Sequence, residues 1–289
     1  MNTLKMKTKN RAKRAFTLIE IMVATVIMVV LVGLVIQITS EVLKVWTRSS
    51  GKLSANAEAR IAMDLITQDL ETAVFRNNGQ QWLRVDAPLP GGGQYSGQTV
   101  GLKLFSPALD RPAGPGDICS IGYRLSYKQS YANGANVYAL YRRIVDPKAT
   151  FDNYLGSASD TSSPQISLDS AALWADSLIT ADDNYLVSNI VGFKVLVYEL
   201  DPATDQAVLI NGSVADGELT VDYAYGGDAA LPEVSTNQLL YADVILTVVS
   251  DAGLEMLDHI DSIPEDADEV VALHGEVFTR RVNFMAHPL

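Results

Sequence analysis

Residues 11–36, RAKRAFTLIEIMVATVIMVVLVGLVI, decide how this chain is organised. Lys13 and Arg14 precede Ala15, and from Phe16 onward the stretch is apolar, with Glu20 as its only charged residue. The 21 residues from Phe16 to Ile36 would rise about 32 Å as an α-helix, which is enough to cross a hydrocarbon layer of about 30 Å. The sequence therefore predicts one membrane-spanning helix near the amino end.

The charges on the two sides of this segment predict its orientation. The residues before it include no acid, and they carry the basic side chains Lys5, Lys7, Lys9, Arg11, Lys13 and Arg14. The residues after it open with Gln37, Thr39 and Glu41. Because basic flanks are retained on the cytoplasmic side, we expect a single-pass inner-membrane protein with a cytoplasmic amino end and a periplasmic carboxyl-terminal part.

Glu20 is an unusual residue for a membrane segment. A carboxylate costs about 2.5–3.5 kcal/mol at the centre of a bilayer, and less near its surface, so such a residue usually has a partner. Cleavage between Ala15 and Phe16 would create a cationic amine on Phe16. This amine does not reach Glu20 of its own helix comfortably, but the amine of a neighbouring subunit, shifted along its axis, could pair with it.

The run Phe16-Thr17-Leu18-Ile19-Glu20, after a short basic leader, resembles the cleavage and methylation motif of type IV pilins and type II secretion pseudopilins. In that family, prepilin peptidase cuts before the Phe and methylates the new amine, and the Glu guides assembly into a filament. The resemblance implies processing at Ala15 and Phe16 and an assembly role for Glu20. Ala15 stands where the family usually has Gly, so we expect slower processing.

The same resemblance, which extends over residues 11–75, implies the partners of the protein. These are prepilin peptidase, other pilin-like subunits, an inner-membrane assembly platform and membrane lipid. It implies either a type II secretion system or a type IV pilus-like filament. A head of about 210 residues would crowd a repeating shaft, so we expect a minor subunit, near the tip.

A signal peptide and a plain membrane anchor are two other interpretations of the amino end. A secretory signal peptide has an apolar core of about 7–15 residues, and this core is longer. A plain membrane anchor would not need Glu20. The alternative function is therefore a membrane-tethered periplasmic binding or enzymatic domain with an anchor that is not cleaved.

Composition limits what the rest of the chain can do. The 289 residues carry a formal charge of −12, which becomes −18 without the basic leader, and such a surface repels nucleic acid. Cys119 is the only cysteine, so the chain has no internal disulfide. Ile118 and Ile121 flank this cysteine, and we expect it to be buried in a strand.

The helix is predicted to continue beyond the membrane, because no proline appears before Pro88. Apolar residues follow at helical spacing, among them Leu53, Ala57, Ile61, Leu65, Ile66, Leu70 and Val74, with Asp64 and Asp69 among the polar positions between them. Asn77-Asn78-Gly79 is typical of a helix end after residue 76. The predicted organisation is a cleaved leader at 1–15, a transmembrane and then amphipathic helix at 16–79, and a β-rich periplasmic head at 80–289.

The head alternates between short apolar runs and turn residues. Strands are predicted at 82–85, 99–105, 118–127, 137–145, 186–200, 219–225, 239–249 and 276–284, the last near an edge. The runs at 118–127 and 137–145 form a predicted hairpin, residues 88–93 a loop, and residues 146–180 a surface insertion anchored by Trp174. The predicted fold is α+β and pilin-like, with the long helix packed on a mostly antiparallel sheet.

Two short runs in the head carry a further resemblance. Tyr123-Arg124-Leu125 and Leu140-Tyr141-Arg142-Arg143 resemble the head of the large minor pseudopilin usually labelled J. The long, strand-rich prepilin-like proteins known as Verru_Chthon cassette protein C are also similar to the chain.

Chemical sites are not indicated by the sequence. The acidic residues Asp261, Glu265, Asp266, Asp268 and Glu269 supply oxygens that calcium accepts, but their spacing is not that of a helix-loop-helix site, and we expect them to face water. His259, His274 and His287 lack paired zinc-ligand spacing. We therefore predict no catalytic set, no metal, no cofactor and no enzymatic activity.

Overall fold

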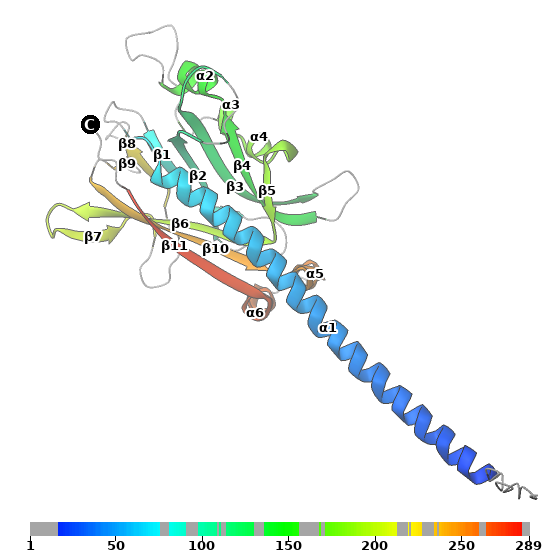
Figure 1. Cartoon of the computed structure of the whole chain (residues 1–289). Coiled ribbons are helices and arrows are strands. Elements are labelled where there is room, and N and C mark those ends of the chain that lie inside the picture. Colours follow the sequence, from blue (N-terminus) through cyan, green and yellow to red (C-terminus); the bar gives the residue numbers. More distant parts are fainter. Residues whose placement is uncertain are drawn as a thin grey trace, which may run out of the picture. The chain divides into compact units, whose positions relative to one another are not determined.

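The computed structural model describes residues 17–75, 81–90, 98–108, 110, 114–129, 136–155, 168, 171–212, 219, 221–226, 234–235, 237–259 and 264–284. The chain divides into two compact units, Met1–Ser49 and Ser50–Leu289, and each is described by itself. Figure 1 labels the helices and strands in chain order.

Helix α1 runs from Leu18 to Glu71. The prediction that it continues to residue 76 is wrong, because the backbone leaves the helix after Glu71 and joins the sheet. The amide of Val74 donates to the carbonyl of Phe105 on β2 (Gln98–Ser106) at 2.9 Å. Strand β2 thus supplies a hydrogen-bond acceptor for the backbone after the helix, and the sequence pattern does not reveal this acceptor. The predicted helix end at Asn77-Asn78-Gly79 lies outside the described residues.

In the part of the head that the structure describes, eleven strands form one sheet. Besides β2, they are β1 (Gln81–Pro90), β3 (Cys119–Gln129), β4 (Asn136–Val145), β5 (Tyr185–Ser188), β6 (Ile190–Asp201), β7 (Gln206–Leu209), β8 (Tyr223–Gly226), β9 (Val234–Ser235), β10 (Leu239–Val249) and β11 (Gly275–Asn283). The short helices of the head are α2 (Pro147–Thr150), η1 (Phe151–Leu155), α3 (Ala171–Trp174), α4 (Asp176–Ile179), η2 (Asp182–Asn184), α5 (Asp251–His259) and α6 (Pro264–His274).

The sheet is mostly antiparallel and branches at β2. Its longest path is β11-β10-β6-β2-β1-β8-β9, while β3 pairs with β2 and β4, and β5 pairs with β4. Among the described residues only the β2–β6 and β8–β9 pairs are parallel. Figure 1 shows β6, β10 and β11 as one group of strands and β2 to β5 as another. The predicted α+β class, a long amino-terminal helix with a mostly antiparallel sheet, is therefore confirmed.

Several predicted strands are confirmed. Strands β3 and β4 form the expected antiparallel hairpin, with Tyr123 opposite Arg142, and Cys119 is buried. Strand β10 buries Ala242, Val244 and Leu246 on one face, as its alternation predicted. Among the described residues, β11 ends the sheet next to β10, in agreement with its predicted place near an edge.

Two strand predictions need correction. The single strand predicted at 186–200 is two strands, because Asn189 adopts a left-handed φ of 65° between β5 and β6. The chain changes partners there, since β5 pairs with β4 and β6 with β10. The loop predicted at 88–93 begins later than expected, because Leu89 and Pro90 still pair with Thr99 and Gln98 of β2. Residues 91–97 lie outside the described residues.

The part of α1 within the head unit packs only partly through the predicted stripe, of which Ile66 and Leu70 are buried. The buried residues are Ala55, Ala59, Ala62, Met63, Ile66 and Leu70, whereas Leu53 and Ile61 are 68% and 56% exposed. Both stripes have helical spacing, so periodicity alone does not choose between them. The observed stripe is rich in alanine, whose small side chain lets the helix backbone approach the sheet.

The segment predicted as a surface insertion, 146–180, contains several short helices rather than only loop. Trp174 is buried, as predicted, with its ring against Gly122 of β3, where a β-carbon would clash with the indole. Residues 156–167 of this segment lie outside the described residues.

Candidate functional site

The amino end of α1 forms a capping box built from Thr17 and Glu20. The amide of Glu20 donates to Oγ1 of Thr17 at 3.3 Å, and the amide of Thr17 donates to Oε2 of Glu20 at 3.0 Å. The Thr17 hydroxyl donates to the same Oε2 at 3.1 Å. Each residue thus satisfies a backbone amide of the other, at the helix end where negative charge is favourable.

The capping box gives Glu20 a partner within its own chain, which the sequence analysis missed. The Thr-x-x-Glu spacing before an apolar run was the signal that could have revealed it. Only Oε2 accepts hydrogen bonds from the described residues, so Oε1 has none within that part of the chain. The predicted cleavage residues Ala15 and Phe16 lie outside the described residues, and processing there stays a prediction.

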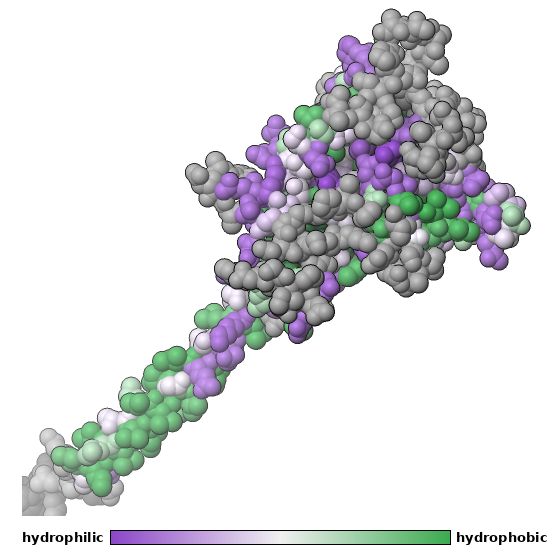
Figure 2. Space-filling view, turned by 180° about the vertical axis from the view of Figure 1, so that it is seen from behind, coloured by the Kyte–Doolittle hydropathy of each residue, from purple (hydrophilic) through white to green (hydrophobic). Residues whose placement is uncertain are grey.

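The helix that follows is apolar and exposed in the isolated chain. Figure 2 shows green, apolar side chains along the visible face of this segment. Among the described residues, Leu18–Glu71 is the one helix that is long and apolar enough to cross a membrane, and the most apolar window within it is not covered by the protein. Its length and composition are compatible with a single-pass membrane anchor.

The acidic stretch near the carboxyl end differs from its predicted form. Glu265, Asp266, Asp268 and Glu269 fall on α6 and not in a loop, and Asp261 lies outside the described residues. Within the described ranges, His, Cys, Asp and Glu side chains form no group of three that could hold a metal ion.

A buried charge network links α1 to the sheet within the head unit. Arg142 of β4 donates to Asp69 of α1 through Nε at 2.9 Å and Nη2 at 3.1 Å, and to Asp110 through Nη1 at 2.6 Å. The Tyr123 hydroxyl also donates to Asp69. Asp69, which the sequence analysis placed among the polar positions of the helix, is 3% exposed. No sequence signal identified it as buried.

The network keeps fixed protonation states. Burial, followed by the charge of Asp69, raises the pKa of Tyr123 well above its ordinary value, so its hydroxyl remains a donor. Burial lowers the pKa of Arg142, but the neighbouring Tyr123, Asp69 and Asp110 outweigh it and raise the pKa above its ordinary value. The arrangement holds two elements together.

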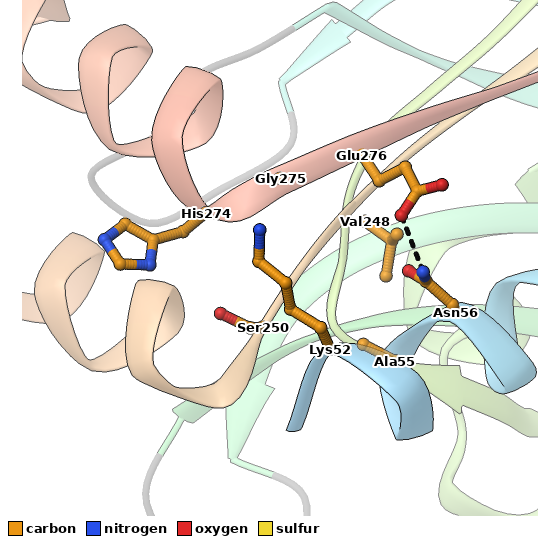
Figure 3. A pocket seen from close by; sticks show the side chains of 8 residues that line it. All are labelled: Lys52, Ala55, Asn56, Val248, Ser250, His274, Gly275 and Glu276. Carbon is orange, nitrogen blue, oxygen red and sulfur yellow. Dashed lines mark hydrogen bonds between the residues drawn. The ribbon is translucent and has the colours of Figure 1, made fainter. Parts of the chain in front are cut away.

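A cavity of about 10 Å³ lies where the head's portion of α1 meets β10 and β11. Figure 3 shows Lys52, Asn56, Ser250, His274 and Glu276 around it, with Asn56 Nδ2 donating to Glu276 Oε2 at 2.6 Å. The Ser250 hydroxyl is buried and has no hydrogen-bond partner among the described residues. The volume suffices for about one water molecule, so this junction is structural.

Comparison with known proteins identifies the amino-terminal segment. Residues 10–36 match the prokaryotic N-terminal methylation motif. A type IV-like pilin from Thermus thermophilus is similar in structure, with a TM-score of 0.35 and 10% sequence identity, over 79% of this chain and 95% of that chain. No curated protein matches the sequence. This chain thus carries the prokaryotic N-terminal methylation motif at the start of a long apolar helix.

Proposed function

We propose that this chain is a minor pilin-like subunit of a type II secretion or type IV pilus-like filament. Prepilin peptidase cuts it between Ala15 and Phe16 and methylates the new amine of Phe16. The methylation motif at residues 10–36 is the observation that carries this proposal. The six basic residues of the leader support a cytoplasmic amino end in the inner membrane and a periplasmic head.

The geometry at Glu20 supports its role in assembly. Oε2 is engaged by Thr17, while Oε1 accepts no hydrogen bond from the described residues. An arriving Phe16 amine from a neighbouring subunit can therefore pair with Oε1 without breaking the capping box. The capping box also limits the cost of holding Glu20 in the membrane before assembly, because its hydrogen bonds replace part of the lost hydration.

The exposed stripe of α1 in the head unit supports contact with other subunits. Leu53 and Ile61 are 68% and 56% exposed, although both are large apolar residues and another stripe of the same helix is buried. Large apolar side chains exposed in a row mark interaction surfaces more often than single exposed ones do. Helices of neighbouring subunits are the partners that a filament supplies.

The size of the head supports a minor, tip-proximal position. The compact unit Ser50–Leu289 carries eleven strands and several short helices in addition to its portion of α1. Such a head placed at every step of a shaft would crowd its neighbours, whereas at the tip it has open space.

Intact mass spectrometry tests the proposal directly. The full chain is co-expressed with prepilin peptidase and purified from the membrane, and we expect a mass that lacks residues 1–15 and carries one added methyl group. The peptidase-free culture is the control, and it should yield the uncut chain. An uncut chain in both cultures would contradict the filament proposal and leave a membrane-tethered periplasmic domain.

A further inference from the structure

The sheet face opposite α1 carries charged residues. These residues are buried, although charged residues on a sheet face that meets solvent are ordinarily exposed. Tyr123 points toward Asp69 on α1, so its neighbours Gly122 and Arg124 lie on the opposite face of β3. Register places Arg84 opposite Lys103 and Asp86 opposite Gly101 on that same face. Arg124 in turn lies opposite Gly101, which completes one patch across β1, β2 and β3.

This patch forms the floor of a cavity of about 260 Å³. The cavity is lined by Asp86, Gly101, Lys103, Arg124, Trp174, Asp176, Ile179 and Asp222. The absence of a side chain at Gly101 leaves the centre of the floor open, and α4 supplies one wall. The volume lies just below the roughly 300–1,000 Å³ of pockets that hold drug-sized ligands, which suits a smaller molecule.

The cations of this patch are buried, and two of them, Lys103 and Arg124, line the cavity itself. Arg84, Lys103 and Arg124 are 7%, 6% and 5% exposed. Lys103 pairs with Asp86 at 2.8 Å and Arg124 with Asp176 at 3.2 Å. Arg84 pairs with Asp86 at 2.5 Å and with Asp222 at 3.4 Å. Burying an ion is unfavourable unless its hydrogen bonds are complete. The hydrogen bonding of these buried cations therefore shows whether the protein alone stabilises them.

The hydrogen bonding of the floor is incomplete. Nη1 of Arg124 and Nη1 of Arg84 are buried and have no hydrogen-bond partner in the part of the chain that the structure describes. The carboxylates of Asp176 and Asp222 stay partly exposed, at 70% and 44% of their side-chain surface, and retain free lone pairs. Arg124 lines the cavity, and its unpartnered buried donor indicates that a polar ligand completes the network there.

We propose that this cavity binds a neutral polyhydroxylated ligand, a single pyranose unit of a glycan. Its three aspartates are balanced by Lys103 and Arg124 of the lining and by Arg84, which pairs with Asp86 and Asp222 from outside the lining, so neither an anion nor a cation gains net attraction. Hydroxyl groups donate and accept at once, which matches guanidinium donors next to carboxylate acceptors. Trp174 and Ile179 supply an apolar wall for the carbon–hydrogen face of the ring.

Binding of simple sugars to the full chain tests this proposal. The protein is held in dodecylphosphocholine, a detergent without a sugar headgroup, and the probes are methyl glucopyranoside, methyl galactopyranoside and N-acetylglucosamine. We expect saturation-transfer NMR to detect at least one of them with a millimolar dissociation constant. Asp176→Asn should weaken that binding about tenfold, because it removes a charged acceptor. Gly101→Val should abolish it by filling the floor.

The matched control is Asp182→Asn. Asp182 is also an exposed aspartate that pairs with one cation, Lys128 at 2.9 Å, but it does not line the cavity, so binding should be unchanged. Absence of saturation transfer from all three sugars would overturn the proposal. So would binding that survives both Asp176→Asn and Gly101→Val, or binding of glutamate or inorganic phosphate in place of the sugars. Asp176→Asn changes an exposed side chain, so this test stands even if Gly101→Val does not fold.

Discussion

Arg142 on β4 donates hydrogen bonds to both carboxylate oxygens of Asp69 on α1, from Nε at 2.9 Å and from Nη2 at 3.1 Å. Both side chains are almost completely buried, at 5% and 4% exposure. This bidentate pair sits in the alanine-rich interface between α1 and the sheet, where an unpaired carboxylate would be costly. The pair therefore holds α1 against the sheet and also fixes the position of the helix along it.

Replacing Arg142 by Met should destabilise the head strongly. The substitution leaves Asp69 buried without its cation, and breaking such a pair costs about 3–5 kcal/mol. Urea denaturation of the full chain, followed by circular dichroism, measures the loss. The control is Arg280→Met, because Arg280 also joins α1 to a strand through Asp64 at 2.5 Å but is exposed. That change should cost about 1 kcal/mol or less, and equal losses would contradict the role assigned to burial.

The two stripes of α1 should respond oppositely to substitution. Ala59 is fully buried, so Ala59→Leu overpacks the interface with the sheet and should cost about 1–3 kcal/mol in the same denaturation assay. Ile61 is exposed, so Ile61→Ala should change the free energy of unfolding by only about 0.5 kcal/mol. Under the proposed function, Ile61→Ala should nevertheless reduce recovery of the protein in sheared filament fractions. Wild-type recovery would argue against the exposed stripe as a subunit contact.

The capping box and the subunit pairing at Glu20 are separable by mutation. Thr17→Val removes a side-chain cap worth about 1 kcal/mol but keeps the carboxylate, so assembly should persist. Glu20→Gln keeps a hydrogen-bond acceptor and removes the charge, so membrane insertion should persist while incorporation into filaments fails. Membrane fractionation and filament recovery from the same cells measure the two steps. Filaments that contain the Gln variant at the wild-type level would contradict charge pairing with the Phe16 amine.

Glu199 should make stability depend on pH. Burial raises the pKa of Glu199 above its ordinary value, despite hydrogen bonds donated by Ser235 and Tyr223 at 2.5 Å each. The folded state then binds a proton more tightly than the unfolded state, so stability falls as pH rises from the ordinary value through the raised one. Glu199→Gln removes this loss, and its advantage in Tm over wild type should grow from about pH 4 to pH 7.

The comparison for Glu199 is Glu255→Gln on α5, which makes the same change at an exposed acid. Parallel Tm curves for the wild type and the Glu199→Gln variant over this range would show that burial of Glu199 carries no such cost.

Much of the fold could be predicted from local patterns. An apolar run with one early acid predicts a membrane-type helix and its motif, because a bilayer imposes length and composition on one segment alone. Period-two alternation identified β3, β4 and β10, because alternate residues of each strand lie on a buried face. The break at Asn189 was missed, because the change of pairing partner from β4 to β10 depends on strands distant in the sequence.

The sequence by itself determined the long apolar amino-terminal helix, its methylation motif and the α+β class, because these follow from composition and periodicity along single segments. Only the tertiary structure decided which stripe of α1 is buried, that Asp69 is paired with Arg142, and that Arg84, Lys103 and Arg124 line one face of the sheet. The physical reason is that burial of a charge is set by what packs against it, and those partners come from segments far apart in the chain.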